Sequence, residues 1–282
     1  MSTFETITSP SNPRVRAAAA LRAADARRDT GLTLVDGRRE CARAVAAGAE
    51  VVELFVAATV FTRSRPDSGA FAEWLGGLTG RGTPLSIVAE KPFERLAFGS
   101  RNEGVVAVVR WRAAALDAMT FAADRPVLVI EGVEKPGNLG AILRTADAAG
   151  LAGVVVCDGR TDPANPAVIR ASLGTVFAVP LAVGTTVETI RWCASHGRRV
   201  VAATPTGQLL WHEAALARNT ALLLGSEAHG ITPAWQQAAT AGSIALDTVR
   251  LPMHGVADSL NLSVTAAVLA YEAVRQQMEQ CP

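Results

Sequence analysis

Lysine, tyrosine and paired cysteines are scarce in this chain of 282 residues. Lys91 and Lys135 are its only lysines, so the positive charge is almost entirely arginine. Guanidinium groups suit bidentate contacts with phosphate, although a GC-rich genome would give the same composition. No CxxC spacing occurs, which favours reduced structural thiols and predicts no metal site; the four cysteines are Cys41, Cys157, Cys193 and Cys281.

Long apolar runs and a secretory signal are also missing. No uncharged stretch approaches the ~20 residues that cross a bilayer. Residues 1–13 are polar and lack the apolar core of a signal peptide. We therefore expect no membrane segment and a cytoplasmic protein.

The length exceeds the roughly 100 to 200 residues usual for one domain, which favours two. A formal net charge of +1 argues against a bulk polycation. Residues 1–110 nevertheless hold 15 of the 27 Lys and Arg against 12 of the 26 Asp and Glu. The basic excess therefore lies in the N-terminal part.

The N-terminal part has the pattern of a small α/β unit. Residues 13–28 form an arginine-rich helical stretch, and short apolar runs follow as strand candidates at 32–35, 51–56, 85–88 and 105–109. The segment 62–69 is typical of a surface loop. We predict a domain over 1–110 and an alanine-rich, helical linker over 111–124, with a second domain over 125–282.

The C-terminal part alternates strand and helix patterns more regularly. Its apolar runs, bounded by Gly and Pro, are typical of strands buried on both faces. This predicts a parallel sheet with helices on both sides and a last helix over 258–278. The expected strands are 127–130, 153–156, 176–179, 200–203, 221–224 and 243–246.

The first segment with chemical content is a glycine-rich turn at 131–140, which runs from a strand into a helix. It offers backbone amides and a helix N-terminus to a ligand. Its glycines at 132, 137 and 140 miss the GxGxxG spacing, and no P-loop is present, which argues against a dinucleotide-dependent oxidoreductase. Arg144, six residues after Asn138, could point back toward the turn; taken alone, it is an ordinary solvated arginine.

Two further segments place polar groups after buried strands. Residues 222–230 end in Glu227 and His229 at the carboxyl edge of the sheet, where ligands bind in α/β folds, although a capping carboxylate and a loop histidine would have the same pattern. In 251–264, Ser259, Asn261 and Ser263 crowd a helix start that needs only one cap.

In this order and spacing, the three segments resemble the three motifs of the SpoU (TrmH-like) family of RNA 2′-O-ribose methyltransferases in the SPOUT superfamily. The matching stretches are 136–146, 224–230, and 251–253 with 259–264. Asn12-Pro13, 35–37 and 104–106 are similar to the ribosomal-protein-like RNA-binding domain that often precedes this catalytic domain.

The resemblance implies a parallel α/β domain with a deep trefoil knot, a feature almost absent elsewhere. Arg144 would be the catalytic residue, assisted by Asn138, Glu227, Ser259 and Asn261. S-adenosylmethionine would lie in the knot, bound by Thr204, Leu224, Gly225, Glu227, Leu251, Met253, Ser259, Leu260 and Asn261.

The resemblance also implies RNA as substrate and a homodimer, because the family's active site forms between two subunits. Ribosomal RNA, most simply 23S, is favoured over transfer RNA by the separate N-terminal domain, and some relatives protect their own ribosomes from an antibiotic. A non-catalytic RNA-binding protein with the same fold is the other alternative. The arginines expected to contact RNA phosphates are Arg14, Arg16, Arg38 and Arg39.

The sequence departs from the family pattern at two places. Asp258 stands where glutamate is usual, which shortens the side chain by one methylene. Asn102 and Glu103 replace a common His-Gln pair, and the negative charge puts an RNA-contact role for these two residues in doubt.

Overall fold

The structure is a computed structural model that describes residues 4–63, 69–80, 82–98 and 103–280. Its contacts divide the chain into two compact units. One contains Met1–Arg112 and Pro163–Ala178, and the other contains Ala113–Asp162 and Val179–Pro282. The chain therefore passes between the units three times. Asn102 and residues 64–68 of the predicted loop lie outside the described residues.

A mixed five-stranded sheet forms the centre of the first unit, in the order β1-β4-β3-β5-β2. Its strands are β1 (Glu5–Ile7), β2 (Leu32–Asp36), β3 (Glu50–Ala57), β4 (Leu85–Val88) and β5 (Val105–Arg110). The flanking helices are α1 (Pro13–Ala20), α2 (Ala24–Thr30), α3 (Arg38–Ala46), α4 (Ala58–Arg63), α5 (Ala70–Gly80) and α6 (Glu90–Glu94). Val15, Leu34, Phe55 and Phe93 are fully buried between them. The four predicted runs all form strands.

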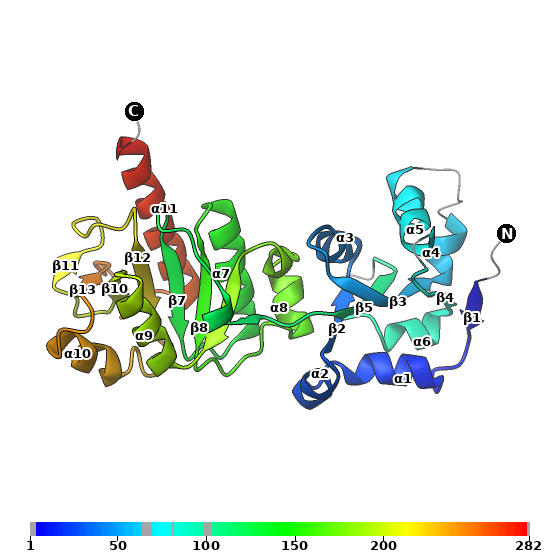
Figure 1. Cartoon of the computed structure of the whole chain (residues 1–282). Coiled ribbons are helices and arrows are strands. Elements are labelled where there is room, and N and C mark those ends of the chain that lie inside the picture. Colours follow the sequence, from blue (N-terminus) through cyan, green and yellow to red (C-terminus); the bar gives the residue numbers. More distant parts are fainter. Residues whose placement is uncertain (1–3, 64–68, 81, 99–102, 281–282) are drawn as a thin grey trace. The chain divides into compact units, whose positions relative to one another are not determined.

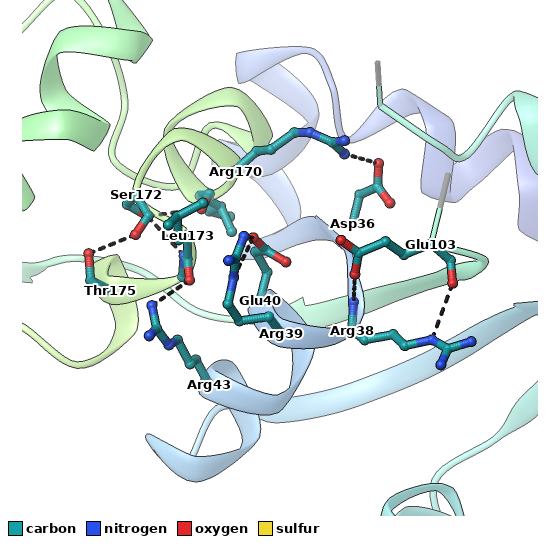
Figure 2. Close-up of polar contacts among 12 residues, drawn as sticks. Asp36, Arg38, Arg39, Glu40, Arg43, Glu103, Arg170, Ser172, Leu173 and Thr175 are labelled. Carbon is teal, nitrogen blue, oxygen red and sulfur yellow. Dashed lines mark hydrogen bonds and ion pairs between the residues drawn. The ribbon is translucent and has the colours of Figure 1, made fainter. Parts of the chain in front are cut away.

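The segment Pro163–Ala178 packs into this first unit although its neighbours in sequence belong to the second. It contains α8 (Pro166–Ala171) and the short 3-10 helix η2 (Thr175–Phe177). Arg170 Nη1 donates to Asp36 Oδ2 over 2.7 Å, and Arg43 Nη1 donates to the Leu173 carbonyl over 2.8 Å. Figure 2 shows these contacts, which join Arg170 on α8 to the end of β2 and Arg43 on α3 to the turn after α8. Burial raises the pKa of the Asp36 carboxyl, despite the hydrogen bond from the Phe98 N–H and the nearby Arg170.

An eight-stranded sheet with parallel pairing throughout forms the second unit, in the order β11-β13-β10-β12-β7-β8-β9-β6. Its strands are β6 (Ala114–Ala115), β7 (Val127–Glu131), β8 (Gly153–Cys157), β9 (Leu181–Gly184), β10 (Arg199–Ala203), β11 (Leu209–Leu210), β12 (Thr220–Leu224) and β13 (Leu246–Arg250). Strands β7, β8 and β12 are buried at every residue, as expected for a sheet covered on both faces.

Helices cover both faces of this sheet (Figure 1). α9 (Thr186–Ser195) and α10 (Pro233–Thr240) lie on one side, where Trp192 and Trp235 share a core with Val127 and Val129. α7 (Pro136–Ala148) and α11 (Leu262–Gln280) pack together on the other. None of the helices in the described ranges is long and apolar enough to span a membrane.

Several predicted elements differ from the structure. The helical stretch expected over 13–28 is divided into α1 and α2, and the last helix begins at Leu262, four residues after its expected start. Residues 176–179 lie at a 3-10 helix and not in a strand, because Phe177 packs against Trp111 in the first unit. The alanine-rich stretch 111–124 is not an α-helix: it forms β6 and η1 (Leu116–Ala118), and buried Arg198 donates to the carbonyls of Phe121 and Ala122. The strand expected at 243–246 is β13, which begins at Leu246.

Candidate active site

A cavity of about 880 Å³ opens beyond the carboxyl ends of β10, β12 and β13. These three strands are neighbours in the sheet, so the loops that follow them meet at one edge. The cavity wall includes eight of the nine residues expected to bind the cofactor, namely Thr204, Leu224, Gly225, Glu227, Leu251, Met253, Ser259 and Leu260. Asn261 lies beside the wall and contacts Glu227.

The cavity fits the size and chemistry of S-adenosylmethionine. Small-molecule sites usually enclose about 300 to 1,000 Å³ and combine apolar walls with a few polar groups, as this one does. At Gly225 an added Cβ would lie 2.1 Å from the backbone carbon of Gly230. The absence of a side chain therefore lets the loop 226–230 close through the Ser226–Gly230 bridge. Among the described residues, no three His, Cys, Asp or Glu side chains are grouped as a metal ion requires.

A polar cluster joins the three motif segments next to this cavity. The Asn138 amide donates to Glu227 Oε1, and Asn261 Nδ2 lies 3.2 Å from Asn138 Oδ1 and 3.4 Å from Glu227 Oε1. Asn261 Oδ1 in turn accepts from the Ser263 N–H and hydroxyl at 2.9 and 2.7 Å, which fixes the amide at the start of α11. The sequence prediction that these segments converge therefore agrees with the geometry for Asn138, Glu227 and Asn261.

Lys135 completes this cluster and was missed by the sequence analysis. Its Nζ lies 2.6 Å from Glu227 Oε2. This hydrogen bond holds the pKa of the Glu227 carboxyl below its ordinary value, against the opposing effect of partial burial, and the Asn138 amide adds to it. A signal was present in the sequence, because one of only two lysines stands in the glycine-rich turn 131–140, immediately before the first motif stretch 136–146.

Buried Glu131 anchors the loop that carries the second motif. Its Oε2 accepts from the Thr232 N–H at 2.8 Å, while Oε1 accepts from the hydroxyls of Thr232 at 2.8 Å and Thr186 at 2.6 Å. Glu131 ends β7 and Thr232 follows the loop 226–230. The carboxylate therefore ties the far end of this loop to the central strand.

Arg144 and Ser259 lie apart from the polar cluster. Arg144 is exposed on α7, and it has no hydrogen bond or ion pair among the described residues and does not line the cavity. Ser259 lines the cavity without a described contact to Asn138 or Glu227. Within one subunit, the expected catalytic arginine is thus not brought to the other motif residues.

The arginines expected to contact RNA differ in exposure and in how they are paired within the protein. Arg16 and Arg39 are exposed, although Arg39 pairs with buried Glu40 at 2.9 Å. Arg14 pairs with Glu53 and, at 2.5 Å, with Glu5, and it donates to Ser86 Oγ at 2.7 Å. Arg38 Nε lies 3.3 Å from the Glu103 carbonyl. Arg14 and Arg38 therefore have structural partners in the first unit.

Glu103 has a local structural role. Its Oε2 accepts from the Arg38 N–H at 2.9 Å, at the first residue of α3 (Figure 2). Gly37, which precedes this helix, offers no side chain to cap it. A carboxylate at a helix N-terminus is favourable, so Glu103 stabilises the start of α3.

A parallel sheet with a polar-rimmed cavity at its carboxyl edge defines a small-molecule-binding α/β domain. Residues 125–271 match the model of the SpoU rRNA methylase family, and residues 12–107 match the MRM3-like substrate binding domain. The chain belongs to the SpoU rRNA methylase family. The predicted family and fold class are confirmed, the dinucleotide oxidoreductase is excluded, and the trefoil knot stays a prediction.

Relatives extend over both units. The chain is 34% identical over 201 residues to the 23S rRNA (guanosine-2′-O-)-methyltransferase RlmB of Bordetella pertussis, covering 70% of this chain and 80% of that protein. It is 27% identical over 283 residues to the 23S rRNA (adenosine(1067)-2′-O)-methyltransferase of Streptomyces azureus, covering 99% and 98%. The crystal structure of an AdoMet-bound rRNA methyltransferase from Sinorhizobium meliloti superimposes with a TM-score of 0.84 at 28% identity, covering 97% and 98%.

Proposed function

We propose that this protein methylates the 2′-hydroxyl of one ribose in 23S ribosomal RNA, with S-adenosylmethionine as the methyl donor. The observation that carries the proposal is the Asn138–Glu227–Asn261 cluster beside a cavity of cofactor size. Both named relatives act on 23S rRNA, which favours ribosomal over transfer RNA. The intact cluster favours an enzyme over a binding protein that has lost activity.

The cofactor would be held by the loops after β12 and β13, with Leu224, Leu251, Met253 and Leu260 as its apolar contacts. When bound, it supplies an electrophilic methyl group on a sulfonium. Gly225 and its neighbours offer backbone groups to its polar parts. Holding donor and hydroxyl in line lowers the barrier by reducing the entropy cost of their encounter.

In the reaction, the ribose oxygen forms a bond to the methyl carbon as the carbon–sulfur bond breaks, and the hydroxyl proton leaves. Asn138, Glu227 and Asn261 would orient the ribose. Guanidinium is protonated at ordinary pH and is a poor base, so Arg144 would stabilise developing negative charge on the oxygen and fix a neighbouring phosphate. That phosphate, or an arginine neutralised by local desolvation, would take the proton.

Because Arg144 has no hydrogen-bond or ion-pair partner in the described part of its own subunit, we assign it to the active site of a second copy in a homodimer. Exposed apolar residues support this arrangement. Val264, Tyr271 and Met278 are 46%, 52% and 71% exposed and recur every seven residues, which places them on one side of α11. An apolar stripe of this kind is typical of a surface that another protein covers.

Mixing two inactive variants tests the shared site. In a one-to-one mixture of Arg144→Ala and Glu227→Ala, half of the randomly formed dimers are mixed, and each has one site with both wild-type residues. We expect about a quarter of wild-type activity. An inactive mixture, with exchange of subunits verified, would place both residues in the same subunit.

The N-terminal domain (1–110) would recognise the RNA through arginine–phosphate contacts, and the C-terminal domain (125–282) would carry the chemistry. The protein would act in the cytoplasm. Protection of the host ribosome stays a prediction, and growth of an expressing strain on ribosome-targeting antibiotics tests it.

The direct test of the function is transfer of tritiated methyl groups to unmodified 23S rRNA or to bulk tRNA. We expect label in 23S rRNA, at one ribose whose adjoining phosphodiester becomes resistant to alkaline cleavage. Label in tRNA alone would contradict the proposed substrate. Label on a base would contradict the reaction.

A further inference from the structure

Lys135 lies within the glycine-rich turn 131–140 and faces solvent. It is the residue immediately before α7, and its side chain is 68% exposed. One N–H of its ammonium is directed to Glu227 Oε2. An ammonium has three donors, and no second partner occurs among the described residues, so two donors remain free for another acceptor.

A second hollow of about 310 Å³ lies at this point and adjoins the cofactor cavity. Val133, Glu134, Lys135 and Asn138 line it together with Glu227, Ala228 and Leu262, and the last three also line the cofactor cavity. A group held in the second hollow would therefore be next to a bound cofactor. Asn138 and Glu227, the proposed ribose contacts, face the same space.

The two carboxylates around this hollow need positive charge to compensate them. Among the described residues that line it, Glu134 and Glu227 are the carboxylates and Lys135 is the only cation. Arg160 Nη1 forms an ion pair with Glu134 Oε1 at 2.8 Å. Lys135 is therefore the cation that neutralises Glu227. RNA brings a phosphate to each side of the target ribose, and without Lys135 the phosphate would approach an uncompensated carboxylate.

We propose that Lys135 binds the phosphate next to the target ribose, bridging it to Glu227 in the second hollow. The inference rests on the proposed function, because it takes the Asn138–Glu227 cluster as the ribose site. Lys135 is then an RNA-positioning residue that holds the sugar at the cofactor cavity. The guanidinium of Arg144 remains the group that stabilises the reacting oxygen.

The test compares Lys135→Gln with Lys135→Arg, and it uses Arg191→Gln as control. Arg191 is an exposed cation on α9, outside the domain proposed to recognise the RNA and away from the walls of both cavities. For each full-length variant we would measure RNA binding by filter retention over a range of salt concentrations in the presence of S-adenosylhomocysteine. Affinity for the cofactor product would be measured by calorimetry without RNA.

We expect Lys135→Gln to weaken RNA binding about tenfold, as for the loss of one charged contact. Its plot of log affinity against log salt should be less steep by about 0.7 to 0.9, the contribution of one phosphate contact. Affinity for S-adenosylhomocysteine should change less than twofold. Lys135→Arg should restore most RNA affinity, and Arg191→Gln should match the wild type.

Two results would overturn the inference. An unchanged affinity and salt slope in Lys135→Gln would show that no phosphate is bound there. Equal losses of RNA and cofactor affinity would show that Lys135 only holds Glu227 in place. Failure of the wild type to methylate any rRNA would instead refute the proposed function, and the binding comparison would still decide whether Lys135 contacts a phosphate.

Discussion

Glu131 and Thr232 are joined by two hydrogen bonds, from the backbone N–H and the hydroxyl of the threonine to the two carboxylate oxygens, each of 2.8 Å. The bonds connect the end of the central strand β7 to the residues after the second motif. Glu131 itself is 3% exposed. The wall of the cofactor cavity therefore depends on a buried carboxylate outside the cavity.

Replacing this carboxylate should weaken cofactor binding. Glu131→Leu leaves the buried Thr186 hydroxyl without its acceptor, at a cost of about 1 to 3 kcal/mol, and removes both bonds that hold Thr232 after the loop 226–230. We expect at least a tenfold rise in the Kd for S-adenosylmethionine by calorimetry. Glu131→Gln can still accept from the Thr232 N–H and donate to the hydroxyls, so it should stay within about threefold of the wild type. Wild-type affinity in Glu131→Leu would show that the loop needs no anchor.

Removing Arg170 should destabilise the first unit. Asp36 has a side chain only 2% exposed and would lose its ionic partner, which costs about 3 kcal/mol, near the lower end for a buried pair because Arg170 is itself 24% exposed. We expect this loss for Arg170→Met in urea unfolding at pH 7.

The loss of stability in Arg170→Met should also depend on pH. Burial already raises the pKa of Asp36, and removing Arg170 raises it further. The folded state then favours the protonated acid, so the stability of Arg170→Met falls as pH rises through the folded-state pKa. The difference in unfolding free energy between the wild type and Arg170→Met should be smaller at pH 5 than at pH 8. The carboxylates of Glu40 and Glu103 lie near Asp36 in both proteins and therefore do not cause this difference. A deficit independent of pH would mean that Asp36 is not the affected group.

Closing the second motif loop requires a residue without a side chain at position 225. In Gly225→Ala the new Cβ would overlap the backbone of Gly230, so the loop must open. We expect at least a tenfold loss of S-adenosylmethionine affinity with a destabilisation of about 1 to 3 kcal/mol. Gly77→Ala on α5, where an added Cβ meets nothing within 4 Å, is the control. Unchanged cofactor affinity would show that the loop tolerates opening.

The gathering of the three motif loops could be predicted from sequence because the carboxyl ends of parallel strands share one edge. The contacts that individual flexible side chains make could not be predicted in this way. Lys135 and Glu227 are 92 positions apart, and their ion pair depends on the backbone path of two turns. The strand predicted at 176–179 was wrong because its apolar residues indicate burial but not the surface against which they are buried.

Helix geometry explains why Arg144 is separate from Asn138. Six residues on an α-helix correspond to about 600°, which leaves the two side chains roughly 120° apart around the axis. Asn138 is buried toward Glu227, while Arg144 faces solvent. The spacing along the sequence suggested that Arg144 could return to the turn, but it did not account for the direction in which the side chain leaves the helix.

The most direct test of the account is the Arg144→Ala variant, measured for cofactor binding and for methyl transfer to 23S rRNA. We predict an S-adenosylmethionine Kd within about twofold of the wild type, because Arg144 lies off the cavity wall. Turnover should fall by about 10²- to 10³-fold, the usual effect of losing one group that stabilises transition-state charge. Arg191→Ala, an exposed arginine on α9, should remain active. Unchanged turnover in Arg144→Ala, or equal loss of binding and turnover, would contradict the account.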